Sequence, residues 1–129
     1  MNATAANVFP FIPRIGAAWG AAGGNFAGTA GREHLIVCPC QPRPIPYDAA
    51  VSWIATLRHA DFDDWRLPTI PELYLIRAAL QYPHGLYWTG SAAANVAEAA
   101  CVDLQTGEVG RFDSSFGLLA LPVRRHVVN

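Results

Sequence analysis

Residues 61–73, DFDDWRLPTIPEL, decide the fold of this chain, because they form a loop that turns directly into the start of a helix. Thr69 and Glu72 have the spacing of a capping box: the Thr69 hydroxyl can accept from the amide of Glu72, and the Glu72 carboxylate can accept from the amide of Thr69. Pro71 falls in the first helical turn, where its missing N–H costs nothing. The stretch therefore predicts a structural corner, formed by Asp64, Trp65, Arg66, Thr69 and Glu72.

The same corner carries a family resemblance. Read as Asp-Trp-Arg-Leu-Pro-Thr-x-x-Glu-Leu, residues 64–73 resemble the signature of the DUF1566 (Lcl C-terminal-like) domains. They are also similar to the Arg-Leu-Pro-Thr corner of the formylglycine-generating (sulfatase-modifying) domains, and both groups are associated with C-type-lectin-like folds. Further matches follow in the family's order at Trp53 and at residues 87–91, 103–107 and 123–125, and residues 15–37 resemble the glycine-rich opening of phage-borne members. The resemblance implies one C-type-lectin-like domain over residues 15–129.

The composition is globular and poor in charge. Hydrophobic residues make up 52% of the 129 residues and charged residues 15%, which suits a single domain with a genuine core. A net charge of -1 leaves no basic stripe for phosphates, so we expect no nucleic-acid partner. Because a surface with few charges favours cover by another protein, we expect self-association or a place in a virion shell.

The opening of the chain bears on localisation. Residues 1–10 lack the basic and the continuous apolar regions of a signal peptide. No run approaches the ~20 apolar residues that a membrane span needs. We therefore expect synthesis in the cytoplasm without a signal peptide, no membrane insertion, and arrival at a virion surface by assembly or lysis.

The three cysteines favour free thiols. Cys38 and Cys40 flank a proline, a spacing poorly suited to an unstrained disulfide, and Cys101 lies far away in an apolar stretch. A C-x-C half-site for zinc lacks a matching second pair, since His34 and His126 are not at ligand spacing. We therefore expect no metal and no cofactor.

Residues 1–14 predict an apolar arm that Pro10 and Pro13 keep from forming a helix. The arm can lie on its own core or pack on a neighbouring subunit. Because a closed core has limited room for further large side chains, we hypothesise the second, which makes the protein an oligomer. The apolar side chains of this oligomer arm are Val8, Phe9, Phe11 and Ile12.

The periodicity of the rest, with two helices first and strands last, predicts an α+β fold. Together with the C-type-lectin-like fold that the resemblance implies, we expect two helices packed on a small, mostly antiparallel twisted sheet with long loops. The glycines of residues 16–31 favour tight turns pegged by aromatic side chains over a nucleotide loop. Asp48 is expected to cap a helix over residues 49–59, and the helix after the corner should run over 70–80 and bury Leu80. Strands are predicted at 34–37, 86–89, 99–104, 108–112, 118–121 and 123–127, with Pro122 marking an edge or a bulge.

The chain offers little for catalysis. It contains neither a G-x-S-x-G nor an H-E-x-x-H motif. The resemblance implies that a sulfatase-modifying enzyme uses two cysteines late in the chain, and only Cys101 stands there. Three carboxylates, Asp61, Asp63 and Asp64, leave calcium open, but the Gly and terminal Glu of a 12-residue calcium loop are missing. We expect solvated loop carboxylates, one of them paired with Arg66.

Binding is the remaining function class. Small polar and aromatic residues of the late loops suit adaptable recognition, although ordinary polar loops have the same composition. We expect a non-enzymatic structural or recognition module on a phage or prophage virion, either a capsid decoration subunit or a fibre-tip binder of a receptor or surface glycan. The alternatives are a secreted bacterial glycan-binding adhesin domain and a degenerate sulfatase-modifying enzyme. The candidate contact residues are Ser91, Asn95, Arg111, Phe112, Asp113, Ser114, Ser115 and Phe116.

Overall fold

The computed structural model describes residues 12–90 and 97–127 and has the predicted α+β class. Its helices are α2 (Tyr47–Ala55) and α3 (Ile70–Ala79), with a short 3-10 turn, η1 (Gly20–Ala22). Its strands are β1 (Ala18–Trp19), β2 (Gly24–Ala30), β3 (Glu33–Val37), β4 (Arg43–Ile45), β5 (Leu86–Trp88), β6 (Glu98–Asp103), β7 (Val109–Asp113), β8 (Leu118–Ala120) and β9 (Val123–Val127).

The strands form two sheets instead of the single small sheet that the sequence suggests. One has the order β1-β2-β3-β9 and the other β4-β8-β5-β6-β7. The pairs are antiparallel except that β5 and β8 run parallel. The chain changes sheet between β8 and β9, where the Pro122 carbonyl accepts from the amide of Cys38 at 3.0 Å. The prediction of an edge strand after Pro122 is confirmed, because β9 lies at the end of its sheet.

The order of elements corrects the expectation that helices come first. Four strands precede α2, and the glycine-rich segment contributes two of them, β1 and β2. The predicted aromatic pegs of this segment are confirmed: Trp19 and Phe26 are buried and their rings lie edge to face with centroids 5.7 Å apart. Gly23 has φ +94° at the end of η1, a conformation that favours glycine, so the tight-turn interpretation holds there.

The two helices differ from prediction at their ends. The N-cap of α2 is Pro46 and has no side-chain cap, so Asp48 lies inside the first turn and the prediction that it caps the helix was wrong. Helix α3 starts where predicted, but Leu80 is its C-cap with an extended ψ of 140°. Leu80 is therefore 44% exposed, and the prediction that it is buried was wrong.

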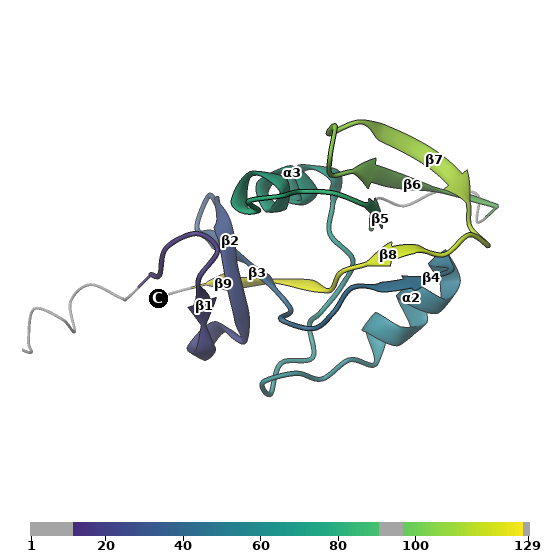
Figure 1. Cartoon of the computed structure of the whole chain (residues 1–129). Helices are drawn as coiled ribbons and strands as arrows, with labels where there is room; N and C mark the ends of the chain where they lie inside the picture. The colour runs from purple at the N-terminus through teal and green to yellow at the C-terminus, as the bar shows by residue number, and fades with distance from the viewer. Residues whose placement is uncertain (1–11, 91–96, 128–129) are drawn as a thin grey trace, which may run out of the picture.

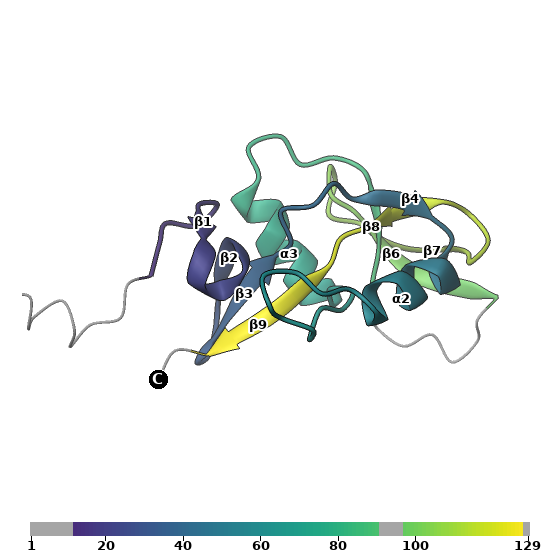
Figure 2. The same ribbon diagram turned by 90° about the horizontal axis from the view of Figure 1, so that it is seen from below.

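The core lies between the sheets and the helices. Figure 1 shows α3 beside β2 and α2 beside β4 and β8, with the hairpin of β6 and β7 at the end of the molecule away from β1. Figure 2 shows β9 running alongside β3 on the same side as the corner that precedes α3. None of the helices in the described ranges is long and apolar enough to cross a membrane.

Candidate functional site

A buried carboxylate organises the corner. The side chain of Glu72 is 1% exposed, and Arg66 donates to it from both guanidinium ends at 2.7 and 2.8 Å. The amide of Thr69 donates to the same carboxylate at 2.9 Å, while the amide of Glu72 donates to the Thr69 hydroxyl at 3.3 Å. The predicted capping box is confirmed. Arg125 of β9 adds a third cationic bond, from Nε to Oε2 at 2.6 Å.

These bonds fix the charge of Glu72. Burial alone would raise the pKa of this carboxyl, but the hydrogen bonds from Arg66, from the Thr69 amide and from Arg125 outweigh burial and lower the pKa to about 2. Glu72 is therefore ionised throughout the neutral range and has its acceptor sites occupied by structural partners. The role of Glu72 is therefore structural: it connects the corner to the last strand.

A second ion pair corrects the expected partner of the aspartates. Asp64 pairs with Arg124, from Nε to Oδ1 at 2.7 Å, whereas Arg66 pairs with Glu72. Arg124 is buried, donates to the carbonyl of Ala22 at 2.7 Å, and its guanidinium carbon lies 3.6 Å from the ring centroid of Phe62. The prediction that a loop aspartate pairs with Arg66 was therefore wrong. Arg66 is instead engaged by the buried Glu72, and β9 supplies the cation that Asp64 pairs with.

Two histidines that are far apart in sequence lie opposite each other. His34 of β3 and His126 of β9 are register partners, and both rings lie edge to face with Trp19. His34 shares a 2.7 Å hydrogen bond with the Thr29 hydroxyl, and Arg124 lies 3.2 Å from Nδ1 of His126. Burial first, then the charge of Arg124 and His34, lowers the pKa of His126. The sequence separation of 92 residues hides this pair from any spacing rule.

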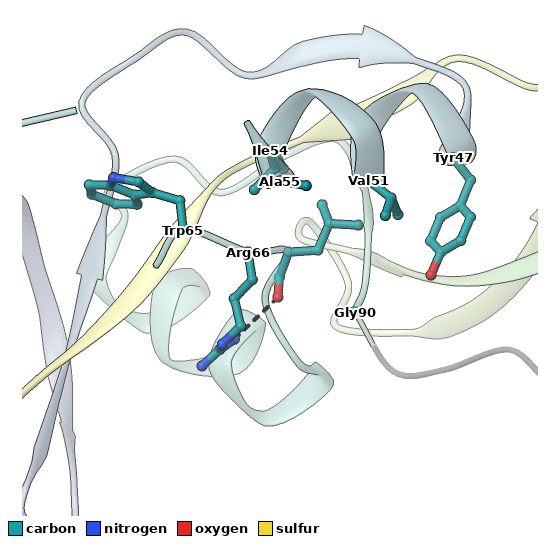
Figure 3. A pocket seen from close by; sticks show the side chains of 8 residues that line it. Tyr47, Val51, Ile54, Ala55, Trp65, Arg66 and Gly90 are labelled. Atoms are coloured by element: carbon teal, nitrogen blue, oxygen red, sulfur yellow. Dashed lines mark hydrogen bonds between the residues drawn. The ribbon is translucent and has the colours of Figure 1, made fainter. Parts of the chain in front are cut away.

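One pocket lies directly behind the corner. It has a volume of about 270 Å³ between α2, residues 65–67 and Gly90. Figure 3 shows Tyr47 and Val51 pointing from α2 towards the loop after β5 that carries Gly90. Arg66 points to the other side and donates to the carbonyl of Leu67 at 3.2 Å. The lining is mostly apolar, and the guanidinium of Arg66 is already committed to Glu72, so we assign no ligand to this pocket.

The structure describes six of the eight candidate contact residues. Ser91 and Asn95 lie outside the described residues. Arg111, Phe112 and Asp113 belong to the edge strand β7, and Ser114, Ser115 and Phe116 form the turn after it.

Within that turn, Asp113 is exposed and accepts from both the hydroxyl and the amide of Ser115, at 2.6 and 2.9 Å, and these bonds lower the pKa of its carboxyl. The ring of Phe116 lies 5.8 Å from that of Phe112, yet Phe116 is 53% exposed. The turn is thus held by hydrogen bonds of Asp113 and carries an exposed aromatic ring.

A second pocket of about 270 Å³ was not anticipated from the sequence. It lies between the end of β3, the C-terminal end of α3 and the start of the domain, and Gly16, Cys38, Cys40, Ala79 and Leu80 are among its lining residues. All three cysteines are free thiols. Leu80 could have indicated this pocket from the sequence, because a large apolar residue directly after a helix end is exposed when the helix ends before it. Of the four apolar side chains of the predicted arm, only Ile12 is described, and it is 46% exposed; Val8, Phe9 and Phe11 lie outside the described residues.

Comparisons with known proteins identify no family. The chain matches no protein-family model, and it matches no curated protein. Within residues 12–90 and 97–127, no group of three or more His, Cys, Asp and Glu side chains is arranged to hold a metal ion.

Proposed function

We propose that this chain is a non-enzymatic structural and recognition module with a C-type-lectin-like fold, and that it serves as a subunit on the surface of a phage or prophage particle. The fold proposal rests on the resemblance of residues 64–73, and two helices with mostly antiparallel sheets are compatible with it. The particle is proposed as the site of action because residues 15–37 resemble phage-borne members.

The observation that carries the proposal is that the ionisable groups of the corner, two of them buried, serve structural contacts. Glu72, Asp64 and Arg124, together with Arg125, bond to one another or to the backbone and hold the corner against β9. Strongly perturbed carboxylates often mark active sites, but structural ion-pair networks perturb them as well, and every partner of Glu72 here is structural. This use of the ionisable groups favours a module that binds over one that catalyses.

The recognition surface is proposed to be the β7 edge and its turn. Val109 and Phe116 are 50% and 53% exposed, and Arg111 between them is exposed. Aromatic and arginine side chains are common anchors of protein interfaces. A capsid neighbour or a surface glycan would contact these residues.

Immunogold labelling of particles tests this proposal. Antibodies against the chain would be applied to particles purified from an induced culture of the strain that encodes it. Label on intact particles is the expected result, and a Phe116→Ser, Arg111→Ser variant should be displaced from particles or lose binding on a glycan array. Protein confined to the cell fraction, with unlabelled particles, would contradict the proposal.

A further inference from the structure

The pocket between β3 and the end of α3 is built to receive apolar side chains. Phe26 and Tyr87 contribute aromatic surface to it, and Leu80 stands at its edge with 44% of its surface exposed. A cavity of ~150 Å³ is enough for a benzene ring, so a space of about 270 Å³ has room for one aromatic ring and part of a second side chain. An open apolar pocket of this size beside an exposed leucine is therefore a candidate binding site for an apolar side chain.

The chain itself supplies a matching segment. Residues 8–11, Val-Phe-Pro-Phe, place three large apolar side chains around one proline, immediately before the described start of the chain. Pro10 has a fixed φ and disfavours the helical region for Phe9, so the segment loses fewer conformations on docking than a fully flexible peptide would. We propose that this pocket receives Phe9 or Phe11 from residues 8–11 of a second copy of the chain. The inference rests on the proposed function, in which the chain is a subunit of an assembly.

Geometry favours a second copy over the same chain. In Figures 1 and 2 the first described residues, ahead of β1, lead away from the two sheets. Ile12 and Ile15 are 46% and 60% exposed, so neither isoleucine is covered by its own domain, although Pro13 between them is buried. At ~3.1 Å per residue, an extended segment could carry Phe9 up to roughly 16 Å from Arg14, far enough to reach a pocket on a neighbouring copy.

The end of α3 provides a matched pair of positions for a test. Ala79 lines the pocket and is half-buried, whereas its neighbour Ala78 is exposed and does not line it. A side chain added at Ala79 meets the incoming segment, and the same side chain at Ala78 points elsewhere on the same helix. The native thiol of Cys40 interferes little with a disulfide assay, because burial and the neighbouring Cys38 raise its pKa to about 12.

Disulfide trapping between two differently sized chains tests the inference. Val8→Cys chains, which keep Phe9 and Phe11, are mixed with tagged Ala79→Cys chains and oxidised with diamide, which takes up the two protons and two electrons that the thiols lose. A covalent product of the summed mass is expected, at least tenfold more abundant than with tagged Ala78→Cys chains. A chain that carries both Val8→Cys and Ala79→Cys should give the same intermolecular product.

Sedimentation provides the second measurement. Ala79→Arg should weaken self-association of the full chain at least tenfold, while Ala78→Arg leaves it unchanged, with circular dichroism confirming that both fold. An internal disulfide in the doubly substituted chain, with no mixed product, would overturn the inference in favour of docking on the chain's own core. Equal trapping at the two alanine positions, or none, would overturn it too. These outcomes are separate from particle labelling, which tests the proposed function alone.

Discussion

Nε of Arg125, in the last strand, lies 2.6 Å from Oε2 of Glu72, in the first turn of α3. The two residues are 53 positions apart in the sequence, and their bond joins the corner to the four-stranded sheet. The backbone repeats the connection, since Arg66 and Val123 exchange amide-to-carbonyl bonds at 2.9 and 2.8 Å. The corner is therefore both a helix start and the place where the end of the chain is held.

Thr69→Ala tests the local part of this arrangement. The substitution removes the hydroxyl that accepts from the amide of Glu72, so one helix-terminal N–H loses its partner. We expect the free energy of unfolding to fall by ~1 kcal/mol. Urea denaturation measures it, and Thr69→Ser, which keeps the hydroxyl, should recover most of the loss. An unchanged midpoint in Thr69→Ala would remove the energetic role of the cap.

Acid titration tests the charge of Glu72. Its folded pKa of about 2 lies below the ordinary value of an unfolded glutamate, so its contribution to stability is complete above that unfolded value and is lost as the pH falls towards 2. Against an unfolded pKa of ~4.3, the contribution is on the order of 3 kcal/mol. Unfolding free energies measured between pH 5 and pH 2.5 should drop more steeply for the native chain than for Glu72→Gln. Parallel curves would contradict the role given to the carboxylate.

His126 predicts a second dependence on pH. Its pKa is lowered in the folded protein by burial and by the nearby charge of Arg124, so the unfolded chain takes up this proton first. Stability should therefore be complete above the unfolded value of ~6.5 and decrease as the pH falls below it. His126→Asn keeps an acceptor near Arg124 but cannot be protonated, and should flatten the profile between pH 7.5 and pH 5.5. A profile as steep in His126→Asn as in the native chain would contradict the role given to His126.

Chelation tests the aspartates before the corner. Asp64 is engaged by Arg124, and Asp61 and Asp63 are exposed. Addition of EDTA should leave the melting temperature unchanged. A fall of several degrees that calcium restores would instead make these three carboxylates ligands.

The sequence predicts this fold best where the determining contacts are local. The Thr69–Glu72 capping box is confirmed because both partners lie within one helical turn. The same reasoning failed for Asp48, since Pro46 starts α2 without any side-chain cap. It failed for Leu80 because periodicity cannot say at which residue a helix unwinds.

Contacts between residues that are far apart in the sequence were not predicted. Asp64 and Arg124 are 60 positions apart, and only the pairing of β9 with β3 brings the arginine to the corner. Strand β2 escaped as well, because its glycines and alanines show no alternation of apolar and polar side chains, although Phe26 within it was predicted as a peg. The pocket at Leu80 is formed by the end of α3 and by β2. It was not predicted because neither feature was placed correctly from the sequence.

The central claim is that the buried carboxylate of Glu72 holds the corner to the last strand, and a comparison of two glutamines tests it directly. Glu33 also pairs with Arg125, but at 3.7 Å and with 51% of its side chain exposed, so Glu33→Gln is the matched control. We expect Glu72→Gln to lower the free energy of unfolding in urea at pH 7 by about 3 kcal/mol, and Glu33→Gln by no more than ~0.5 kcal/mol. Equal and small losses in the two variants would contradict the claim.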